Sequence, residues 1–505
     1  MNRFALGSVA LVLSTVAISA QTALPQATDS YFRAAQKQVQ DHLQQTPKTG
    51  RAKNVILFVG DGMGISSVTA GRILEGQLRG VDGESNTLSF DRFPYSAFSK
   101  TYTHDAQVAD SAPTASAMMT GVKLRNDVIG LNADAMPGDC AGSKGKEVMS
   151  VAAMAELSGS SVGVVTTARL THATPASVYA HTPNRDWESD PEVPKADKDA
   201  GCTDIASQLI DWPYGDGIEV ALGGGRDRFS LQTATDPEGQ KFEKPREKRD
   251  LIQEWLTRFS NSGAYVWNKA QFDAIDPKVT QHLLGLFEVS HMQYEVDRVK
   301  GTPNEPSLAE MTSKAIDMLS TNPNGYFLMV EGGRIDHGHH GGNAYRALHD
   351  VVALDGAVKA ALSKVDLNET LIIVTADHSH VFVIAGYPKR NNPIFETVTD
   401  PSGKTALAAD GKPYTTLGYL NGPGAAAMGR PHPKPTAPLA PTDPDYKQQA
   451  AVPLGSETHG GEDVGIYATG PWAHLFSGVV EQNYIYHVID HATGWSQKLA
   501  SKKSP

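Results

Sequence analysis

Residues 55–64 read VILFVGDGMG: five apolar residues, Val55 to Val59, lead directly into a glycine-rich turn that carries Asp61. Similar short apolar runs occur at 162–165, 327–330 and 371–374, with further candidates at 218–222 and 464–468. A run that is apolar throughout, rather than at alternate positions, is typical of a strand covered on both faces, as in a parallel sheet. We therefore expect these runs to be strands of a mostly parallel sheet.

Helical patterns lie between the apolar runs, at 146–157, 307–319 and 343–365. Strands that alternate with helices predict an α/β fold, a three-layer sandwich with helices on both faces of the central sheet. Residues 226–306 interrupt the pattern and are predicted to be an insertion with its own short elements. Residues 386–455, rich in Pro, Gly and Ala, are too long for a plain loop. They predict a peripheral cap or subunit-contact insertion; an irregular excursion is the alternative.

Length and charge limit the possible functions. A chain of 505 residues fits about three domains by length alone, or one large domain with insertions, and we expect a single α/β domain over 21–505. The net charge of −11 and the lack of a long basic run argue against a nucleic-acid partner. If the substrate is an anion, metal ions or a local arginine must reverse the field at the site.

The first 20 residues predict an export signal, because the positive Arg3 precedes an apolar segment that ends in small residues. A buried N-terminal helix is the alternative. No later stretch is long and apolar enough to span a bilayer, so we expect no membrane anchor and a periplasmic or secreted protein. In that compartment the two cysteines, Cys140 and Cys202, are expected to form a disulfide, with two buried free thiols as the alternative.

Metal-ligand residue types follow four of the predicted strands. They are Asp61 after the first, Glu331, Asp336 and His340 after the run at 327–330, Asp377 and His378 after 371–374, and His172 and Thr174 after 162–165. In open α/β sheets the ligand crevice lies outside the carboxyl ends of the strands, so these side chains are predicted to converge. Each motif alone is more typical of a turn or a surface hydrogen bond; gathered together, they indicate metal ions.

The residue types suggest which ions. Carboxylate with imidazole suits zinc, whereas oxygen-only sets with a hydroxyl suit magnesium. Asp336 and His340 stand four apart, so one helical turn can direct both at one ion. Asp61 has two carboxylate oxygens and could bridge two sites.

Ser111 is the candidate nucleophile. The segment 109–121 reads ADSAPTASAMMTG, in which Pro113 suits a first helical turn and Gly121 suits the end of the helix. Ser111 would then lie at a helix N-terminus, where the free N–H groups favour an alkoxide and a phosphate. The alternative is that Ser111 only caps the helix.

Seven motifs in one order resemble the alkaline phosphatase family. They are VGDGMG with Asp61, DSA with Ser111, THATPAS with His172 and Thr174, HTPNRDW with Arg185, EGGRIDHGHH, TADHSH, and ETHGGED with His459. The resemblance runs from about residue 53 to 495 and is closer to the animal enzymes than to the enteric bacterial one. It implies hydrolysis of phosphate monoesters through a phosphoserine intermediate, with two Zn²⁺ and one Mg²⁺, in a homodimer.

The resemblance also implies a role for each matching residue. Asp336, His340 and His459 would hold the first zinc, Asp61, Asp377 and His378 the second, and Asp61, Thr174 and Glu331 the magnesium. Arg185 would bind two phosphate oxygens. His172 and His337 would lie just outside the metal ligands, where the enteric enzyme carries Asp and Lys. Phe287 and Glu288 resemble part of the animal enzymes' calcium site, which adds Ca²⁺ as a further expectation.

Two other hypotheses remain at this stage. A phosphodiesterase or sulfatase of the same metalloenzyme superfamily is the nearest, although a sulfatase needs an arginine where Ala115 stands, and nucleotide pyrophosphatases usually present a threonine nucleophile and lack the Arg185 clamp. The other is an exported phosphate- or metal-binding protein whose site is a relic. The intact nucleophile and ligand set argue against it.

Overall fold

The computed structural model describes residues 24–300, 304–425 and 439–502, so the predicted signal peptide over 1–20 lies outside the described residues. The chain divides into two compact units, one up to Thr46 and one from Pro47 onward. The first contains helix α1 (Ser30–Leu43), which begins where the Asp29 side chain accepts a hydrogen bond from the Phe32 N–H. The second contains the central sheet and every predicted site residue.

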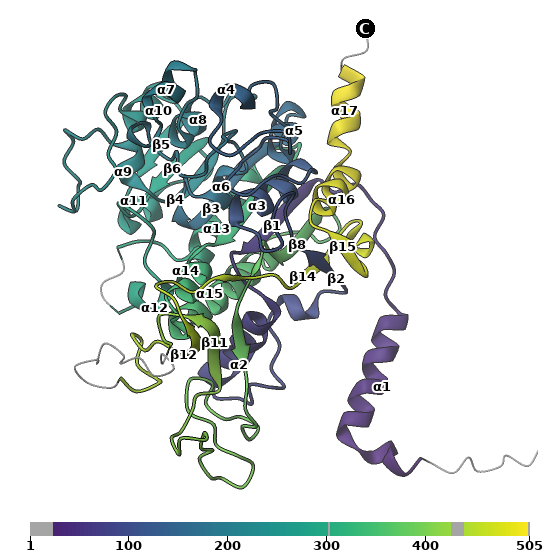
Figure 1. Ribbon diagram of the computed structural model, residues 1–505. Coiled ribbons are helices and arrows are strands. Elements are labelled where there is room, and N and C mark those ends of the chain that lie inside the picture. The colour runs from purple at the N-terminus through teal and green to yellow at the C-terminus, as the bar shows by residue number, and fades with distance from the viewer. Residues whose placement is uncertain (1–23, 301–303, 426–438, 503–505) are drawn as a thin grey trace, which may run out of the picture. The chain divides into compact units, whose positions relative to one another are not determined.

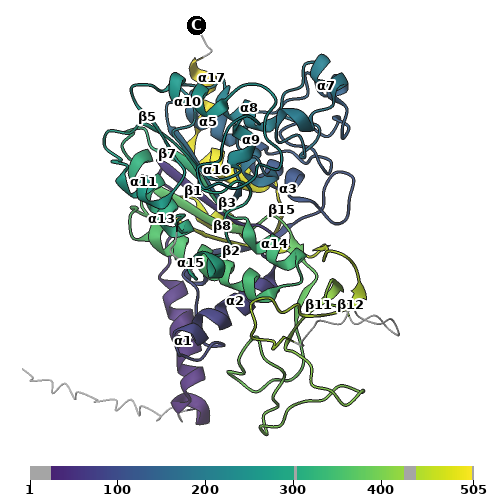
Figure 2. The same cartoon turned by 90° about the vertical axis from the view of Figure 1, so that its left-hand side faces the viewer.

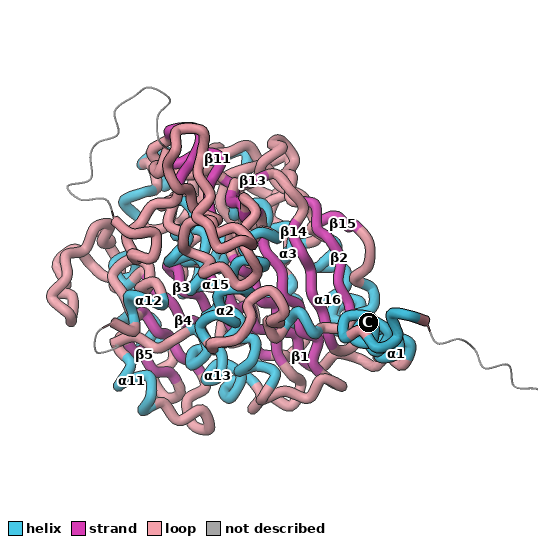
Figure 3. The backbone as a smooth tube through the Cα atoms, turned by 90° about the horizontal axis from the view of Figure 1, so that it is seen from below, coloured by secondary structure: helices cyan, strands magenta, loops and turns pink. Residues whose placement is uncertain are grey.

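A ten-stranded sheet forms the centre of the second unit (Figures 1 and 3). From one edge to the other its strands are β15 (Val479–Glu481), β2 (Tyr95–Lys100), β14 (Val464–Thr469), β8 (Thr370–Ala376), β1 (Asn54–Gly60), β7 (Tyr326–Gly332), β3 (Ser161–Arg169), β4 (Val220–Gly224), β6 (His282–Leu286) and β5 (Gly263–Val266). Within this sheet β14 runs antiparallel to both of its neighbours, and the other pairs are parallel. All six predicted strands lie here, and the prediction of a mostly parallel sheet is confirmed.

Both faces of the sheet are buried, as the continuous apolar runs predicted. Along β1, Val55, Leu57 and Val59 belong to one hydrophobic core, whereas Ile56 and Phe58 belong to a second core on the opposite face. Helices α3 (Ser111–Thr120), α5 (Val151–Leu157), α8 (Ile205–Ile210) and α16 (Tyr484–Thr493) contribute to the first core. Helices α13 (Leu308–Leu319) and α15 (Ala344–Leu362) contribute to the second. Figure 2 shows the strands between these two sets of helices, which confirms the three-layer α/β sandwich.

Side-chain caps set where the predicted helices begin. The helix predicted over 146–157 starts only at Val151, because the Ser150 hydroxyl accepts a hydrogen bond from the Ala153 N–H and so fixes the first turn there. Ser307 and Glu310 form a capping box at the start of α13. Further helices outside the site are α2 (Ile65–Leu78), α9 (Arg226–Phe229), α10 (Leu251–Arg258), α11 (Lys269–Ala274), α12 (Glu295–Arg298) and α17 (Trp495–Lys502).

The two segments that interrupt the alternating pattern have different structures. Residues 226–306 contain short helices together with β5 and β6, which extend the central sheet at one edge. The segment 386–455 contributes β11 (Leu417–Gly422) and β12 (Gln449–Pro453), which join β10 (Phe382–Ile384) in a small separate sheet. A further two-stranded sheet pairs β9 (Ser379–His380) with β13 (His459–Gly460), and this pairing places His459 opposite His380.

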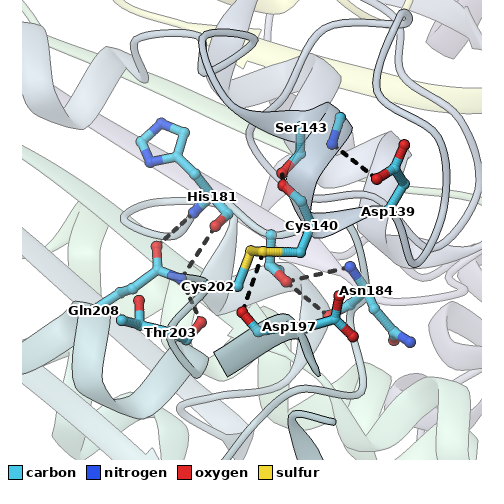
Figure 4. The surroundings of a disulfide bond; sticks show 11 residues. Asp139, Cys140, Ser143, His181, Asn184, Asp197, Cys202, Thr203 and Gln208 are labelled. Atoms are coloured by element: carbon cyan, nitrogen blue, oxygen red, sulfur yellow. Dashed lines mark hydrogen bonds between the residues drawn. A yellow bond between two sulfur atoms is a disulfide. The ribbon is translucent and has the colours of Figure 1, made fainter. Parts of the chain in front are cut away.

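Cys140 and Cys202 form the predicted disulfide (Figure 4). It joins α4 (Cys140–Ser143) to the chain that follows α7 (Lys195–Asp199), across a sequence separation of 62 residues. Among the described residues, no helix combines the length and the apolar character that crossing a membrane requires.

Candidate active site

The central strands bring the predicted ligand segments to one edge of the sheet. Gly60, near the end of β1, is in register with Gly332 of β7 and Ala376 of β8, so the chain leaves all three parallel strands at the same level. Asp61 follows β1 directly and Asp377 follows β8, while Asp336 lies in α14 (Arg334–His340), just after β7. Three buried carboxylates that lie far apart in the sequence therefore share one site.

Ser111 lies at the centre of this site. It is the first residue of α3, and the carboxylate of Asp110 caps that helix by accepting a hydrogen bond from the Ala112 N–H. The Ser111 Oγ lies 3.0 Å from the His378 Nε2 and 3.4 Å from the Asp61 Oδ1. The His378 Nε2 is also 3.4 Å from a carboxylate oxygen of Asp377. A buried hydroxyl at a helix N-terminus thus faces one imidazole and one carboxylate, and a second carboxylate lies beside that imidazole.

A second group lies around Asp336. The Nδ1 atoms of His340 and His459 face the carbonyl oxygens of Glu457, at 2.6 Å, and Ala109, at 2.7 Å. A carbonyl oxygen only accepts, so each Nδ1 donates its proton there, and Nε2 is the ring nitrogen that can offer a lone pair. These two Nε2 atoms lie 3.0 Å apart, and each is within 3.4 Å of the Asp336 Oδ1. Two lone pairs and a carboxylate oxygen that face one another suit a shared cation.

A third group consists of oxygens that lack a protein partner. The Asp61 Oδ2, the Glu331 Oε1 and the Thr174 Oγ1 on α6 (Ala173–Ala176) are buried and make no hydrogen bond with the described residues. Burial and the neighbouring Asp377 raise the pKa of Asp61 well above its ordinary value and that of Glu331 to about 7. Unpaired buried oxygens are costly, and an oxygen-only set of this kind suits magnesium.

Arg185 lies beside Ser111. Its Nη1 is 2.7 Å from an oxygen of Asp110, the residue before Ser111, and its Nη2 is 3.1 Å from the His172 Nε2. The His172 and His337 rings are in edge contact, with their centroids 5.3 Å apart. Burial, opposed only in part by Asp336, lowers the pKa of both histidines well below the ordinary value. Both imidazoles are therefore neutral at neutral and alkaline pH, and the Arg185 guanidinium places a positive charge against Asp110, the residue before Ser111.

Three residues that sequence reasoning left without a role belong to these groups. The His380 Nε2 lies 2.8 Å from the Asp336 Oδ1, and its Nδ1 contacts the buried carboxylate of Glu457. His380 stands two residues after His378 along an extended segment, a spacing that could have indicated a shared site. His291 packs against His337 with ring centroids 4.1 Å apart. It follows β6 in the 226–306 segment, and no sequence signal points to it.

These features define a class of protein: an α/β enzyme with a buried serine hydroxyl among groups suited to metal ions. The alkaline phosphatase family model matches residues 52–495. The tissue-nonspecific alkaline phosphatase of Gallus gallus is 47% identical over 470 residues, which cover 92% of this chain and 89% of the relative. The human tissue-nonspecific isozyme is 46% identical, with 89% and 85% covered. The chain belongs to the alkaline phosphatase family and is a phosphoric monoester hydrolase.

Solved structures agree on the fold. The alkaline phosphatase of Thermus thermophilus superimposes with a TM-score of 0.62 at 21% identity, over 92% of this chain and 98% of that one. The enzyme from the Antarctic bacterium TAB5 gives a TM-score of 0.58 at 22% identity, over 88% and 99%. At this level of identity the likeness describes the fold alone.

Proposed function

We propose that the enzyme cleaves phosphate monoesters through Ser111, with a phosphoserine intermediate, at a site that holds two zinc ions and one magnesium ion. The observation that carries the proposal is the position of the Ser111 Oγ, at the N-terminus of α3 and 3.0 Å from the His378 Nε2. The Asp110 carboxylate already caps the helix, so Ser111 is not needed for capping. Its hydroxyl is therefore free to react.

Each metal has a set of residues that suits it. Asp336, His340 and His459 would hold the first zinc, and Asp61, Asp377 and His378 the second. The unpartnered oxygens of Asp61, Thr174 and Glu331 would hold magnesium. When bound, these cations neutralise the phosphoryl group and favour the ionised forms of the serine and of the attacking water.

The chain's own residues then perform two displacements. The Ser111 Oγ attacks phosphorus, a Ser–O–P bond forms, and the ester P–O bond breaks to release the alcohol, which takes up a proton. Water next attacks the phosphoserine, which restores the hydroxyl and releases inorganic phosphate. Arg185, beside Asp110, would donate to two phosphoryl oxygens throughout. His172 and His337 would position Arg185 and the magnesium surroundings without touching the phosphoryl group.

Replacement of the nucleophile tests the proposal. Ser111→Ala should retain the bound metals but lose nearly all hydrolysis of p-nitrophenyl phosphate at alkaline pH. Ser116→Ala is a matched control, because Ser116 is buried in the same helix and its hydroxyl only accepts a hydrogen bond from the Gly130 N–H. Turnover near the wild-type rate in Ser111→Ala, with metals counted per chain, would exclude Ser111 as the nucleophile.

The rival activity within the superfamily is cleavage of diesters or sulfate esters. A diester has one unsubstituted phosphate oxygen and one negative charge fewer than a monoester. A cationic clamp on two unsubstituted oxygens therefore favours monoesters. We expect p-nitrophenyl phosphate to be cleaved far faster than bis(p-nitrophenyl) phosphate. The reverse preference would support the rival.

A calcium ion is proposed for a separate cavity of about 200 Å³ in the 226–306 segment. Phe287 and Glu288 line it together with Glu238 and Glu305. The buried Glu305 Oε2 has no partner among the described residues, and burial and Glu288 raise the pKa of that carboxyl to about 8. Several carboxylates around a cavity suit a hard cation such as Ca²⁺.

We also propose that the protein is exported to the periplasm or the exterior and forms a homodimer. The disulfide supports the first point, because disulfides persist in oxidising compartments. Family membership supports the second, and the small sheet of β10, β11 and β12 is the candidate contact. Light scattering of the metal-loaded enzyme would give its mass.

A further inference from the structure

A second group of carboxylates lies at the amino ends of the strands, whereas the active site lies at their carboxyl ends. Glu156 belongs to α5, the helix before β3, while Asp216 and Glu219 lie in the segment that leads into β4. His282 is the first residue of β6. The strands β3, β4 and β6 are parallel neighbours, so all four residues lie at their amino ends, whereas Ser111 lies beyond the carboxyl ends.

The three carboxylates present one oxygen each within 4.8 Å of one another. No lysine or arginine in the described parts of the chain forms an ion pair with Glu156 or Glu219. Glu219 accepts a hydrogen bond of 2.7 Å from the Val162 N–H, which fixes that side chain. Burial, followed by the charges of Glu219 and Asp216, raises the pKa of Glu156 to about 9. Three carboxyl groups are thus gathered without a compensating lysine or arginine among the described residues, and Glu156 keeps its proton at neutral pH.

Two buried residues, one in this cluster and one beside it, have polar atoms without a hydrogen-bond partner among the described residues. Glu156 is only 7% exposed, and its Oε2 makes no hydrogen bond with the described residues. His282 is 3% exposed, stacks on Phe259, and has neither ring nitrogen hydrogen-bonded, although its Nε2 lies 3.9 Å from Asp216. Buried polar groups are rarely left without a partner. A bound cation with its coordinated water would provide partners for both the Glu156 Oε2 and the His282 ring.

The loop before β4 places the exposed Asp216 close to Glu156. The loop passes so closely over Glu156 that a Cβ on Gly215 would meet its Oε1, and the positive φ of Gly215 favours glycine there. Gly215 and Gly217, on either side of Asp216, both have positive φ. The Arg258 guanidinium donates to the carbonyl oxygens of Trp212 and Asp216 and ties the loop down. The Asp216 side chain remains 71% exposed, which gives an ion a path from solvent.

We propose that Glu156, Asp216 and Glu219 bind a hard divalent cation, Ca²⁺, at a site separate from the catalytic metals. Oxygen-only ligands with an adjustable exposed carboxylate match the flexible coordination of Ca²⁺, whereas Mg²⁺ requires a stricter octahedron. The ion would join α5 to the loop that starts β4 and so fix the amino ends of three central strands.

Terbium luminescence provides the test, because Tb³⁺ occupies calcium sites and is excited through a nearby tryptophan. The ring of Trp255 lies 6.4 Å from that of His282, which places a sensitiser beside this site. Using enzyme loaded with zinc and magnesium, we expect tryptophan-excited Tb³⁺ emission that Ca²⁺ displaces and Mg²⁺ displaces poorly. The double variant Glu156→Gln/Glu219→Gln should lose that emission and about one Ca²⁺ per chain. Glu288→Gln, in the other proposed calcium cavity, should keep the emission.

The exposed Asp216 keeps the test decisive if the double variant misfolds. Asp216→Asn changes a surface side chain and should weaken Ca²⁺ binding at this site at least about tenfold. Removal of a residue that only supports a metal ligand already lowers metal affinity by about tenfold or more. Wild-type Tb³⁺ emission and Ca²⁺ affinity in Asp216→Asn would overturn the proposal. The outcome is independent of turnover, so failure here would leave the role of Ser111 unaffected.

Discussion

At the scale of single residues, Arg185 is the cation that we propose binds the phosphate of the substrate. Its guanidinium already contacts Asp110 and His172, so it is oriented before phosphate arrives. We expect Arg185→Ala to weaken inhibition by inorganic phosphate about tenfold to a hundredfold, the value of one or two charge-assisted hydrogen bonds. Arg185→Lys should fall between, because an ammonium cannot donate as a planar fork. Arg125→Ala is a control, since that arginine donates to the Ala133 carbonyl. Unchanged product inhibition in Arg185→Ala would contradict the role.

His380 offers a second test, as a positioning residue for Asp336. Its ring joins the Asp336 carboxylate to that of Glu457, so it holds a proposed zinc ligand in place. We expect His380→Gln to lower zinc affinity about tenfold to a hundredfold, the usual effect of removing such a partner. Zinc retained after dialysis against a weak chelator measures this. The neighbouring buried His339 is bonded to Ser67 and Tyr419 instead, so His339→Gln should retain its zinc. Equal loss from both variants would argue against a specific role for His380.

The sequence predicts the ligand candidates that directly follow a predicted strand. It does not predict the residues that only tertiary packing brings to the site. Asp61 and Asp377 follow apolar runs directly, so their meeting follows from the parallel sheet alone. His291 reaches His337 only because β6 joins the edge of that sheet, in a segment with no clear alternation. His380 stood within a quoted motif, yet its partner Glu457 lies 77 residues away, which no local pattern encodes.

At the scale of elements, apolar periodicity predicts the central strands and both covering layers. It does not predict direction: the run at 464–468 resembles the others, but β14 is antiparallel, because the chain enters the sheet after crossing the site with His459. Nor does it predict β5 and β6, whose short runs lie among polar residues. Strand order and direction depend on connections between distant segments, which burial patterns do not contain.

The disulfide should stabilise the layer that carries α4 and α7. It closes a separation of 62 residues, for which loop entropy alone corresponds to about 4 kcal/mol, and disulfides typically contribute about 2–4 kcal/mol. Cys140→Ser/Cys202→Ser should therefore lower the urea midpoint of the metal-loaded enzyme. Neither cysteine lies among the active-site groups, so turnover per folded molecule should remain. Identical urea midpoints would mean that the crosslink adds no stability.

At the scale of the whole molecule, an acidic protein must bind an anion. The net charge of −11 repels phosphate, and the buried Asp61, Glu331, Asp336 and Asp377 place further negative charge in the site itself. The proposed cations would resolve both difficulties, because they would neutralise the carboxylates and attract the phosphoryl oxygens. Metal binding would thereby be coupled to folding as well as to catalysis.

This coupling should depend on pH in a predictable direction. In metal-free protein, burial raises the pKa of Glu331 from 4.5 to about 7 and raises that of Asp61 as well, so the folded state holds protons that the unfolded state has released. The contribution of these two carboxyls to stability should then fall as pH rises from about 4.5 through 7, whereas buried histidines with a lowered pKa, such as His172 and His337, act in the opposite direction below about 6.5. Asp336, whose pKa is lowered by His340 and His380 despite burial, stays ionised over this range and does not offset the fall. The metal-loaded enzyme lacks this loss, so its advantage in melting temperature over the metal-free form should be larger at pH 8 than at pH 5.

Metal-free Glu331→Gln cannot ionise at this position. Its free energy of unfolding should exceed that of metal-free wild type at pH 8 by roughly 1–3 kcal/mol, with little difference at pH 5. Glu243→Gln, at an exposed position, is the control. Parallel stability curves for metal-free wild type and Glu331→Gln from pH 5 to 8 would show that this carboxylate does not link metal binding to folding.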